Sequence, residues 1–479
     1  MPADPALVDR LAQFGQDHVL RFWDELDPEG RNRLIGQLER LDLPRLAQMI
    51  DRLVLSPSKE EALAIDPQQV EPVDVRRVPQ TDSERVIRRR AAERGEAALA
   101  AGEVAAVLVA GGQGTRLGFD APKGTYPIGP VSGASLFQMH AEKLVALGRR
   151  FGKPIPLYIM TSPENHEATT SFFAQHQQFG LDHVRFFVQG QLPAVDAASG
   201  KLLLAAKDSL ALSPDGHGGT ITALAARDHP DQASCLDDMS DRGIQTLFYF
   251  QVDNPLVQIC DPAYLGLHLM AEADISFKVV EKQRPEEKVG VVVQVDGHAQ
   301  VIEYSDLPTE LAERREPDGG LQLWAGSIAI HCFDRAFLER LVSGGGQLPV
   351  HRALKKVPHL GDSGRRVEPE GPNAVKFETF IFDALPLADR WSIVETERAI
   401  EFEPLKNATG PDSPATVRQR LSDLFGDWLE QAGAQVLRRG DGSVPFGIEI
   451  SPLFALDAAE LKQKIEPGLV VDRPIVLGP

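Results

Sequence analysis

The most constraining feature of the sequence is an apolar run that leads into a glycine-rich turn, at residues 104–129, VAAVLVAGGQGTRLGFDAPKGTYPIG. Residues 104–109 are Val, Ala and Leu, a composition typical of a strand buried on both faces of a parallel sheet. The turn contains three glycines: Gly111, Gly112 and Gly114. Without a Cβ, glycines let backbone N–H groups turn toward a bound anion, and Arg116 and Lys123 add positive charge beside them. This combination predicts a polyphosphate site.

Two well-known phosphate loops fit this stretch poorly. A Walker A loop ends in Lys-Ser or Lys-Thr before a helix, and no such pair closes this glycine run. A dinucleotide-binding turn also opens a helix, and its second strand ends in an acidic residue. Here Pro122 interrupts any helix, and the next strand candidate ends in Thr161-Ser162. A purely structural glycine-rich connection explains the three glycines but not Arg116 together with Pro122-Lys123-Gly124.

Strand-like and helix-like runs alternate from residue 104 to about residue 385, which predicts an α/β domain with a mostly parallel central sheet. The clearest further strand candidates are residues 157–160, 184–188, 246–252, 275–280 and 289–295. In open sheets of this class, ligands bind beyond the carboxyl ends of the strands. Gly111 and Asp253 each follow a predicted strand directly, so we expect one cleft to receive both.

The motif GGQGTRLG followed by PKG resembles the nucleotide-binding signature of sugar-1-phosphate nucleotidyltransferases. Its form is similar to the eukaryotic-type UDP-sugar pyrophosphorylase family, especially the N-acetylglucosamine branch, and the resemblance covers roughly residues 104–452. It implies a Rossmann-like nucleotidyltransferase domain of the GT-A type. It also implies that the following residues contact the nucleotide: Ala110, Gly111, Gly112, Gly114 and Thr115.

Asp253 is the candidate metal ligand. It follows an apolar, aromatic run at residues 246–252, and a carboxylate at a buried strand end must be paired. From spacing alone it either caps the next turn or binds a cation. The resemblance implies the second role, because V-D-N looks like the family's metal-binding segment, in which Mg²⁺ bridges carboxylate and phosphates.

Gln189 and Gly216 are the candidate contacts to the base. Gln189 lies in FFVQGQLPA after a predicted strand, and its amide offers a donor and an acceptor that fit the edge of uracil. Gly216 lies in the turn SPDGHGG, which is otherwise an ordinary surface loop. The resemblance implies that Gln189 reads uracil and that Gly216 contacts the nucleotide.

The resemblance also implies a sugar site. Its members here are His217, Gly290, Glu303 and Ser327. Glu303, in VIEYS, would accept bonds from sugar hydroxyls, and Gly290, in KVG, would let the backbone approach the ring. The N-acetylglucosamine branch has Asn at the places of His217 and Ser327, and His resembles the glucose-type enzymes. These departures leave the identity of the sugar open.

Two lysines complete the predicted site, although a solvated surface position is the ordinary interpretation of each. Lys376 lies in NAVKFETFIF and Lys406 in EPLKNA, and both match lysines that the family turns toward substrate phosphates. With Arg116 and Lys123 they provide four cations. The predicted reaction is transfer of UMP from UTP to glucose 1-phosphate or N-acetylglucosamine 1-phosphate, with Mg²⁺ as cofactor. The alternative is a non-catalytic sugar-nucleotide sensor on the same fold.

Length and composition set the remaining expectations. With 479 residues, the chain predicts more than one domain. We expect a helical N-terminal portion and linker at 1–101, the catalytic domain at 102–385 and a small C-terminal domain at 386–479. Within the first portion, an apolar stripe that includes Leu11, Leu34 and Leu38 predicts helices over residues 6–53. Residues 56–79 follow neither period and predict a surface linker, and residues 82–101 predict a further helix. The formal charge of −19 disfavours a nucleic-acid surface. The resemblance implies that the partners are the small-molecule substrates UTP and a sugar 1-phosphate.

Three dispersed cysteines, Cys235, Cys260 and Cys332, indicate neither a zinc site nor a disulfide framework. They are consistent with a reducing cytoplasm. The N-terminus lacks an apolar signal core, and no later stretch offers the roughly 20 apolar residues of a membrane span. We therefore expect a cytoplasmic protein without membrane contact, present as a monomer or a weak homo-oligomer.

Overall fold

The computed structural model of the chain describes residues 4–56, 66–227, 229, 231–345 and 348–478, which form two compact units. The first unit consists of Met1–Asp66, Gln189–Gly219 and Gln347–Asp383. The second consists of Pro67–Val188, Thr220–Gly346 and Ala384–Pro479. These units cut across the three consecutive domains expected at 1–101, 102–385 and 386–479, because packing contacts do not follow chain order. The C-terminal residues, for example, share the hydrophobic core of the second unit through Leu421 and Ile448.

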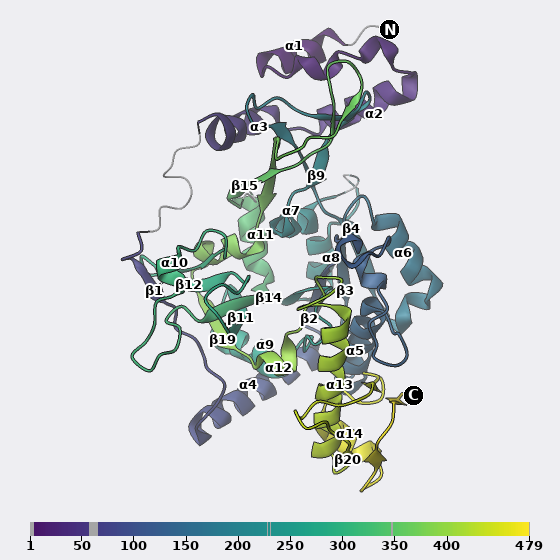
Figure 1. Cartoon of the computed structure of the whole chain (residues 1–479), viewed down its shortest axis with the longest axis vertical. Coiled ribbons are helices and arrows are strands. Elements are labelled where there is room, and N and C mark those ends of the chain that lie inside the picture. The colour runs from purple at the N-terminus through teal and green to yellow at the C-terminus, as the bar shows by residue number, and fades with distance from the viewer. Residues whose placement is uncertain (1–3, 57–65, 228, 230, 346–347, 479) are drawn as a thin grey trace. The chain divides into compact units, whose positions relative to one another are not determined.

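A ten-stranded sheet forms the centre of the second unit (Figure 1). Its strands are β1 (Val70–Pro72), β2 (Val104–Val109), β3 (Leu157–Thr161), β4 (Val184–Val188), β10 (Thr246–Gln251), β11 (Ile275–Glu281), β12 (Val291–Val295), β13 (His298–Ile302), β14 (Ala325–Asp334) and β19 (Trp391–Glu395). Strands β4, β3, β2 and β10 are adjacent in that order and parallel, and β14 pairs with β10 in the antiparallel sense. Beyond β14, β11 and β19 run parallel to each other, whereas β12 pairs with β14, β13 and β1 in an antiparallel branch. The predicted α/β class with a mostly parallel central sheet is confirmed.

The order of the parallel strands creates a topological switch point between β2 and β10. From β2 the chain moves outward to β3 and then to β4, and it returns to the other side of β2 to form β10. The connections that leave β2 and β10 therefore diverge, and the crevice between them at the carboxyl ends is where sheets of this kind bind ligands. The fold thus brings the segments that begin at Ala110 and Val252 to one edge of the sheet.

Helices surround this sheet and extend into the C-terminal part of the same unit. They are α4 (Asp82–Ala101), α5 (Leu136–Phe151), α6 (His166–Gln175), α7 (Thr220–Ala225), α8 (Cys235–Asp241), α9 (Pro262–Met270), α10 (Thr309–Ala312), α11 (Arg335–Ser343), α12 (Arg398–Glu401), α13 (Pro414–Gln431) and α14 (Ala458–Lys464). Four short strands pair in the C-terminal part: β20 (Gln435–Val436), β21 (Ile448–Ile450), β22 (Val470–Val471) and β23 (Ile475–Leu477). The predicted helix at residues 82–101 coincides with α4. It begins with a reciprocal capping box between Thr81 and Glu84 and ends at Gly102, whose φ is +78°.

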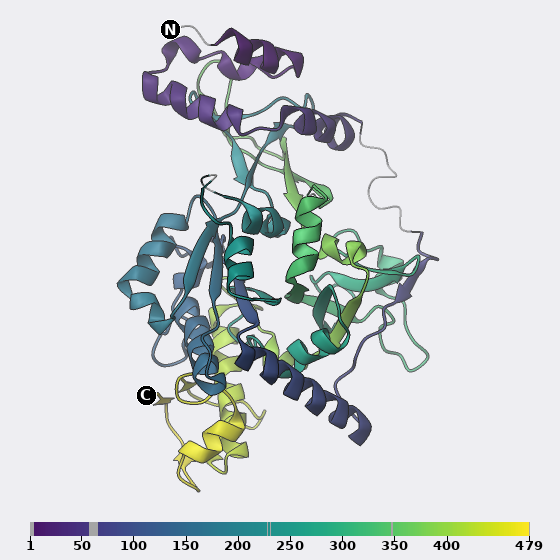
Figure 2. The ribbon, with the colours of Figure 1, turned by 180° about the vertical axis from the view of Figure 1, so that it is seen from behind.

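Helices α4 and α9 lie side by side and pack against each other (Figures 1 and 2). A Cβ at Gly95 would lie 2.0 Å from the carbonyl oxygen of Pro262, and a Cβ at Gly266 would lie 1.6 Å from that of Ala91. No side chain fits at either place, so these two glycines let the helix backbones touch. This contact fixes α9, which follows the loop that carries Asp253.

The first unit combines N-terminal helices with small antiparallel sheets. Its helices are α1 (Pro5–Gln13), η1 (Asp17–Leu20), η2 (Trp23–Glu25), α2 (Pro28–Glu39), α3 (Leu43–Ile50) and η3 (Asp51–Leu55). Its strands are β5 (Gln191–Pro193), β6 (Val195–Asp196), β7 (Leu204–Ala206), β8 (Ser209–Leu210), β9 (Leu212–Pro214), β15 (Val350–Lys355), β16 (His359–Leu360), β17 (Arg366–Val367) and β18 (Ala374–Thr379). The predicted apolar stripe is confirmed, since Leu11, Leu34 and Leu38 are fully buried and share one core with Val375 and Phe377.

The linker predicted at residues 56–79 is wrong for residues 70–72, which form strand β1 at the edge of the large sheet. Val70 is buried opposite Val295, whereas the next residue, Glu71, is exposed. One buried side chain is too short a pattern to show a period of two in the sequence. Residues 57–65 of the predicted linker lie outside the described residues.

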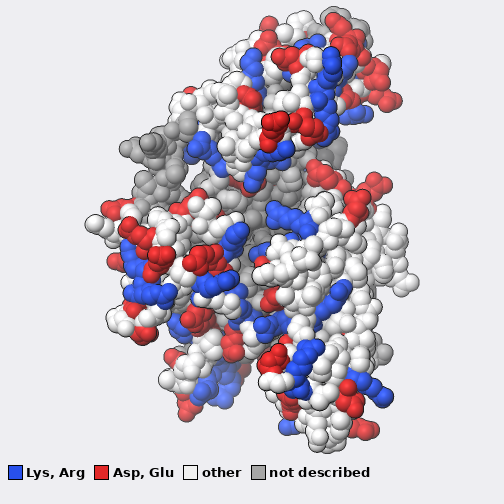
Figure 3. All heavy atoms as spheres, viewed as in Figure 1, with Lys and Arg blue, Asp and Glu red and all other residues white. Residues whose placement is uncertain are grey.

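Acidic and basic side chains are interspersed over the face shown in Figure 3. Among the described residues, no helix has both the length and the apolar composition needed to cross a bilayer.

Candidate active site

The glycine turn and the PKG motif form one folded-back loop at the end of β2. The backbone N–H of Lys123 donates to the carbonyl of Gly112 over 3.1 Å, and that of Gly114 donates to Ala121 over 3.0 Å. The amide of Asn165 anchors the start of the loop through a 2.8 Å bond to the carbonyl of Ala110. The two motifs that suggested phosphate binding are therefore neighbours in space.

No α-helix opens after the glycines. Residues Thr115–Leu117 make a single 3-10 turn, η4, which ends at Gly118 with φ +68°, and Lys123–Thr125 make a second, η5. Within the described part of the chain, the backbone N–H groups of Gly111 and Gly112 donate to no acceptor. Such amides can cradle a phosphate, as the sequence predicted. Arg116 is exposed beside them.

Lys123 and Asp253 meet in the crevice between β2 and β10. The ammonium of Lys123 lies 3.6 Å from Oδ2 of Asp253, and the two side chains are only 18% and 13% exposed. The N–H of Val252 bonds to the carbonyl of Val109, so the pairing of the two strands continues to the edge of the crevice. The glycine loop and Asp253 therefore lie at the same edge of the sheet, where the sequence leads us to expect one cleft.

Lys406 belongs to a segment that adjoins Asp253. The backbone N–H of Leu405 donates to the carbonyl of Asp253 over 2.8 Å, and that of Lys406 donates to Asp412 over 2.7 Å. The Lys406 ammonium lies 5.9 Å from the centre of the Phe402 ring. Burial raises the pKa of Asp412; the charge of Lys406 opposes this rise, and that of Asp253 adds to it. Asp412 is a member of this cluster that the sequence did not reveal, because GPDSP has no recognisable motif.

The three predicted sugar contacts of the second unit lie together. Ser327, on β14, donates its backbone N–H to the carbonyl of Gly290 over 2.8 Å. A Cβ at Gly290 would lie 3.3 Å from Oε1 of Glu303. The ladder between β11 and β14 shifts register here, and Ala329 has φ +55°. This irregularity lets the β14 backbone bend near Ser327.

The predicted base contacts lie in the first unit and are bonded to each other. The amide nitrogen of Gln189 donates to the carbonyl of Gly216 over 2.6 Å. Gly216 has φ +86°, and a Cβ there would lie 2.2 Å from the carbonyl oxygen of Thr379, so only glycine fits. The N–H and hydroxyl of Thr379 both donate to the carbonyl of Asp215, at 2.7 and 2.9 Å. The SPDGHGG turn is thus fixed to β18, the strand that carries half-buried Lys376.

His217, in the 3-10 turn η7 (His217–Gly219), is a neutral imidazole with a fixed tautomer. Its Nδ1 accepts the backbone N–H of Ile381 over 3.1 Å, and its ring packs against Phe380 and Phe382. Burial lowers the pKa of His217 to about 4. At neutral pH its single proton must therefore be on Nε2, which becomes a hydrogen-bond donor.

The predicted site residues are divided between the two units. The second unit brings together the glycine loop, Lys123, Asp253 and the Lys406 segment, and separately Gly290, Glu303 and Ser327. The first unit joins Gln189, Gly216 and His217. Sequence reasoning missed Asn254 and Glu401, whose side chains hold the Asp253 loop, because their partners are more than 100 residues apart in the sequence.

The chemistry of the donors fits a magnesium ion that shares its ligands with a substrate. Among the described residues, no group of three or more His, Cys, Asp or Glu side chains could hold a metal. Mg²⁺ does not require such a cage, since it commonly binds one or two carboxylates together with substrate phosphates and waters. Asp253 provides one carboxylate beside the ammonium of Lys123 and the amides of the glycine loop.

Comparisons with known proteins agree with this geometry. The profile of a family described as UTP–glucose-1-phosphate uridylyltransferase matches residues 47–410. The human UDP-N-acetylhexosamine pyrophosphorylase-like protein 1 is 38% identical over 504 residues, covering 100% of this chain and 97% of that protein. UDP-N-acetylglucosamine diphosphorylase 2 of Arabidopsis thaliana is 37% identical, covering 95% and 91%.

A solved structure extends the similarity to three dimensions. The uridine diphosphate N-acetylglucosamine pyrophosphorylase of Trypanosoma brucei, crystallised with an inhibitor, superposes with a TM-score of 0.82 at 26% identity. The match covers 99% of each chain. The chain is therefore an enzyme that belongs to the UTP–glucose-1-phosphate uridylyltransferase family of UDP-sugar pyrophosphorylases.

Proposed function

We propose that the enzyme transfers UMP from UTP to a sugar 1-phosphate and releases pyrophosphate in a reversible reaction. The observation that carries this proposal is the pairing of Lys123 with Asp253 at 3.6 Å, beside the glycine loop at the switch point of the sheet. A cation and a carboxylate at that edge suit a triphosphate that arrives with a divalent ion.

The reaction needs no protein nucleophile. An oxygen of the sugar phosphate forms a bond to the α-phosphorus of UTP in line with the departing group, while the bond to the β-phosphate oxygen breaks. Pyrophosphate leaves with the electron pair of that bond. The work of the protein is positioning and charge neutralisation.

Each cation then has a role. Lys123 and Arg116, beside the amides of the glycine loop, hold the departing phosphates. Lys376 and Lys406 hold the phosphates at the reacting centre. Asp253 would hold Mg²⁺, which supplies further neutralisation of phosphate charge when bound.

We propose that the sugar is N-acetylglucosamine 1-phosphate or glucose 1-phosphate. The names of the Arabidopsis and Trypanosoma relatives support the first. His217 and Ser327 replace two Asn of the N-acetylglucosamine branch. This replacement supports an enzyme that discriminates less strongly against glucose 1-phosphate. Gln189 and Gly216 are proposed to contact the uracil and ribose end of the nucleotide.

A pyrophosphate-release assay with UTP and a panel of sugar 1-phosphates tests the proposal. Release that requires both substrates and stops in EDTA is expected, and Asp253→Asn should lose most activity and regain only part of it in excess Mg²⁺. Binding of UDP-sugar without any pyrophosphate release would instead indicate a sensor. Full activity in EDTA would remove the metal from the mechanism.

A further inference from the structure

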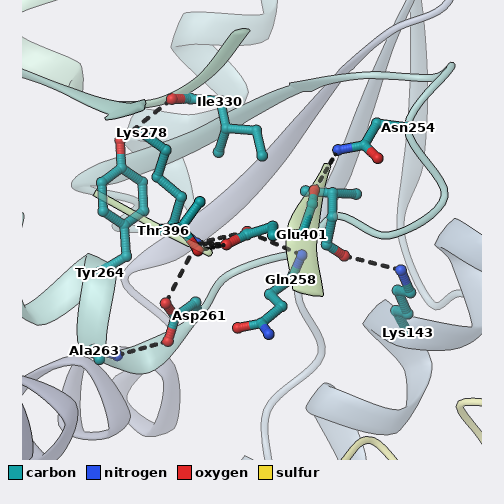
Figure 4. A network of polar contacts seen from close by, with 11 residues as sticks. Lys143, Asn254, Gln258, Asp261, Ala263, Tyr264, Lys278, Ile330, Thr396 and Glu401 are labelled. Atoms are coloured by element: carbon teal, nitrogen blue, oxygen red, sulfur yellow. Dashed lines mark hydrogen bonds and ion pairs between the residues drawn. The ribbon is translucent and has the colours of Figure 1, made fainter. Parts of the chain in front are cut away.

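A buried ion pair that the reaction does not use lies behind the Asp253 loop. The ammonium of Lys278, on β11, lies 2.6 and 2.8 Å from the two carboxylate oxygens of Glu401, at the end of α12 (Figure 4). The two side chains are 2% and 1% exposed. Asp261 lies 3.3 Å from the same ammonium, and the hydroxyl of Thr396 donates to Glu401 over 2.8 Å. A buried pair of this kind is a poor source of stability, which raises the question of what it holds.

Glu401 fastens the loop that carries Asp253. Its carboxylate accepts the backbone N–H of Gln258 over 3.1 Å, and its carbonyl accepts the side-chain amide of Asn254 over 2.8 Å (Figure 4). The oxygen of that amide accepts the backbone N–H of Glu403 over 3.3 Å. Together with the bond from Leu405 to Asp253, these contacts join the 253–258 loop to the segment that leads to Lys406.

The opposite side of the loop is held by α5. The ammonium of Lys143 donates to the carbonyls of Pro255 and Val257 over 2.5 and 2.9 Å. The ring of His140 bonds the carbonyl of Val252 over 3.0 Å. The backbone around Asp253 is thus bonded on both sides, and its position depends on where Glu401 is fixed.

We propose that Glu401, oriented by Lys278 and Thr396, is a positioning residue that sets the Asp253 carboxylate and the Lys406 segment for a metal-bound nucleotide. This inference rests on the proposed function. Groups behind a metal ligand orient it, and their removal typically lowers metal affinity or activity by about 10- to 100-fold.

The test measures Mn²⁺ binding in the presence of UTP by electron paramagnetic resonance, without turnover. Glu401→Gln keeps the shape but removes the charge, so the Mn²⁺ dissociation constant should rise by about 10- to 100-fold. Thr396→Val removes one hydrogen bond to Glu401 and should raise the Mn²⁺ dissociation constant by a smaller factor. Thr396→Ser keeps the hydroxyl and should restore the wild-type value. In activity assays, the Mg²⁺ concentration that gives half activation should rise most in Glu401→Gln, less in Thr396→Val, and remain at the wild-type value in Thr396→Ser.

Asp274→Asn is the matched control. The Asp274 carboxylate lies 2.9 Å from Arg340 and accepts the N–H groups of Asp389 and Arg390, and it directly precedes β11. Loss of the Asp274 charge should lower the melting temperature of the protein while leaving its Mn²⁺ affinity unchanged. Unchanged Mn²⁺ affinity in folded Glu401→Gln would overturn the proposal; if that variant does not fold, an unchanged Thr396→Val would do so.

The two hypotheses fail separately. Wild-type pyrophosphate release combined with unaltered metal affinity in the variants would sink the positioning role alone. Absence of pyrophosphate release, combined with metal affinity that follows the Thr396 series, would sink the proposed reaction and leave the positioning role standing.

Discussion

Lys123 is the residue whose removal should separate catalysis from folding most clearly. We expect Lys123→Ala to lower kcat by on the order of 10²- to 10³-fold, since removing one donor to a developing oxyanion costs about 2.7–4 kcal/mol. The measurement is kcat for pyrophosphate release, with the melting temperature as the check on folding. Lys153→Ala, at an exposed lysine of the same unit, is the control. An unchanged kcat in a folded Lys123→Ala variant would show that Lys123 does not stabilise the departing phosphates.

His217 and Ser327 should decide how strongly the enzyme separates its two candidate sugars. The Nδ1 of His217 is occupied by Ile381, so the ring has at most one donor for a sugar, where Asn would have two donors and an acceptor. An unpaired acetamido group costs roughly 1–3 kcal/mol, which shifts the ratio of kcat/KM values by about one to two decades toward glucose 1-phosphate.

The check is kcat/KM for both sugar 1-phosphates in the wild type and in the His217→Asn, Ser327→Asn double variant. The double variant should recover preference for the acetamido sugar. A strong wild-type preference for that sugar, unaltered in the double variant, would show that other positions set the choice.

At the scale of elements, the predictions from sequence were most accurate where the signal lies within one short stretch of the chain. Strand β2 and helix α4 have the predicted bounds, because a fully buried apolar run and a capping box are both local signals. Strand β1 and the bend at Ala329 were not predictable, since both depend on partner strands that are distant in the sequence. Glu401 was missed for the same reason.

The close approach of α4 and α9 gives a stability test. Gly266→Ala would place a Cβ 1.6 Å from the Ala91 carbonyl, so the helices must separate, at a cost of about 1–3 kcal/mol or more. Gly36→Ala, inside α2, is the matched control, because no atom lies within 4 Å of its Cβ. It should stabilise by about 0.5–1 kcal/mol. Thermal unfolding of both variants tests these two expectations. Equal melting temperatures of Gly266→Ala and Gly36→Ala would contradict the close contact between α4 and α9.

At the scale of the molecule, two buried histidines, His140 and His268, and the half-buried His217 make stability depend on pH. Burial lowers the pKa of His140 to about 3 and those of His217 and His268 to about 4, from 6.5. Between pH 6.5 and 4 the unfolded chain binds more protons at these histidines than the folded chain does. Their contribution to the free energy of unfolding is therefore fully present above pH 6.5 and is lost as the pH decreases below it. Burial raises the pKa of Asp215 from 3.8 to about 6, which opposes part of this loss.

The expected result is a fall in the free energy of unfolding as pH decreases from 7 to 5, by up to about 1.4 kcal/mol per pH unit and histidine. Urea unfolding at a series of pH values measures it. His268→Gln should flatten the profile, because it removes one titrating ring. A constant free energy over this range would contradict the assignment.

The interleaving of the two units has a consequence for the chain while it is being made. The apolar faces of α1, α2 and α3 share their core with Val375 and Phe377, which the ribosome adds only after most of the chain. Val195, Leu202, Leu204 and Leu210 of the same core are made earlier, but at about 5–20 residues per second the faces stay incompletely covered for tens of seconds. A nascent or prematurely terminated chain thus presents a leucine-rich surface that a chaperone or protease can recognise. Synthesis is therefore a stage at which this enzyme is open to aggregation.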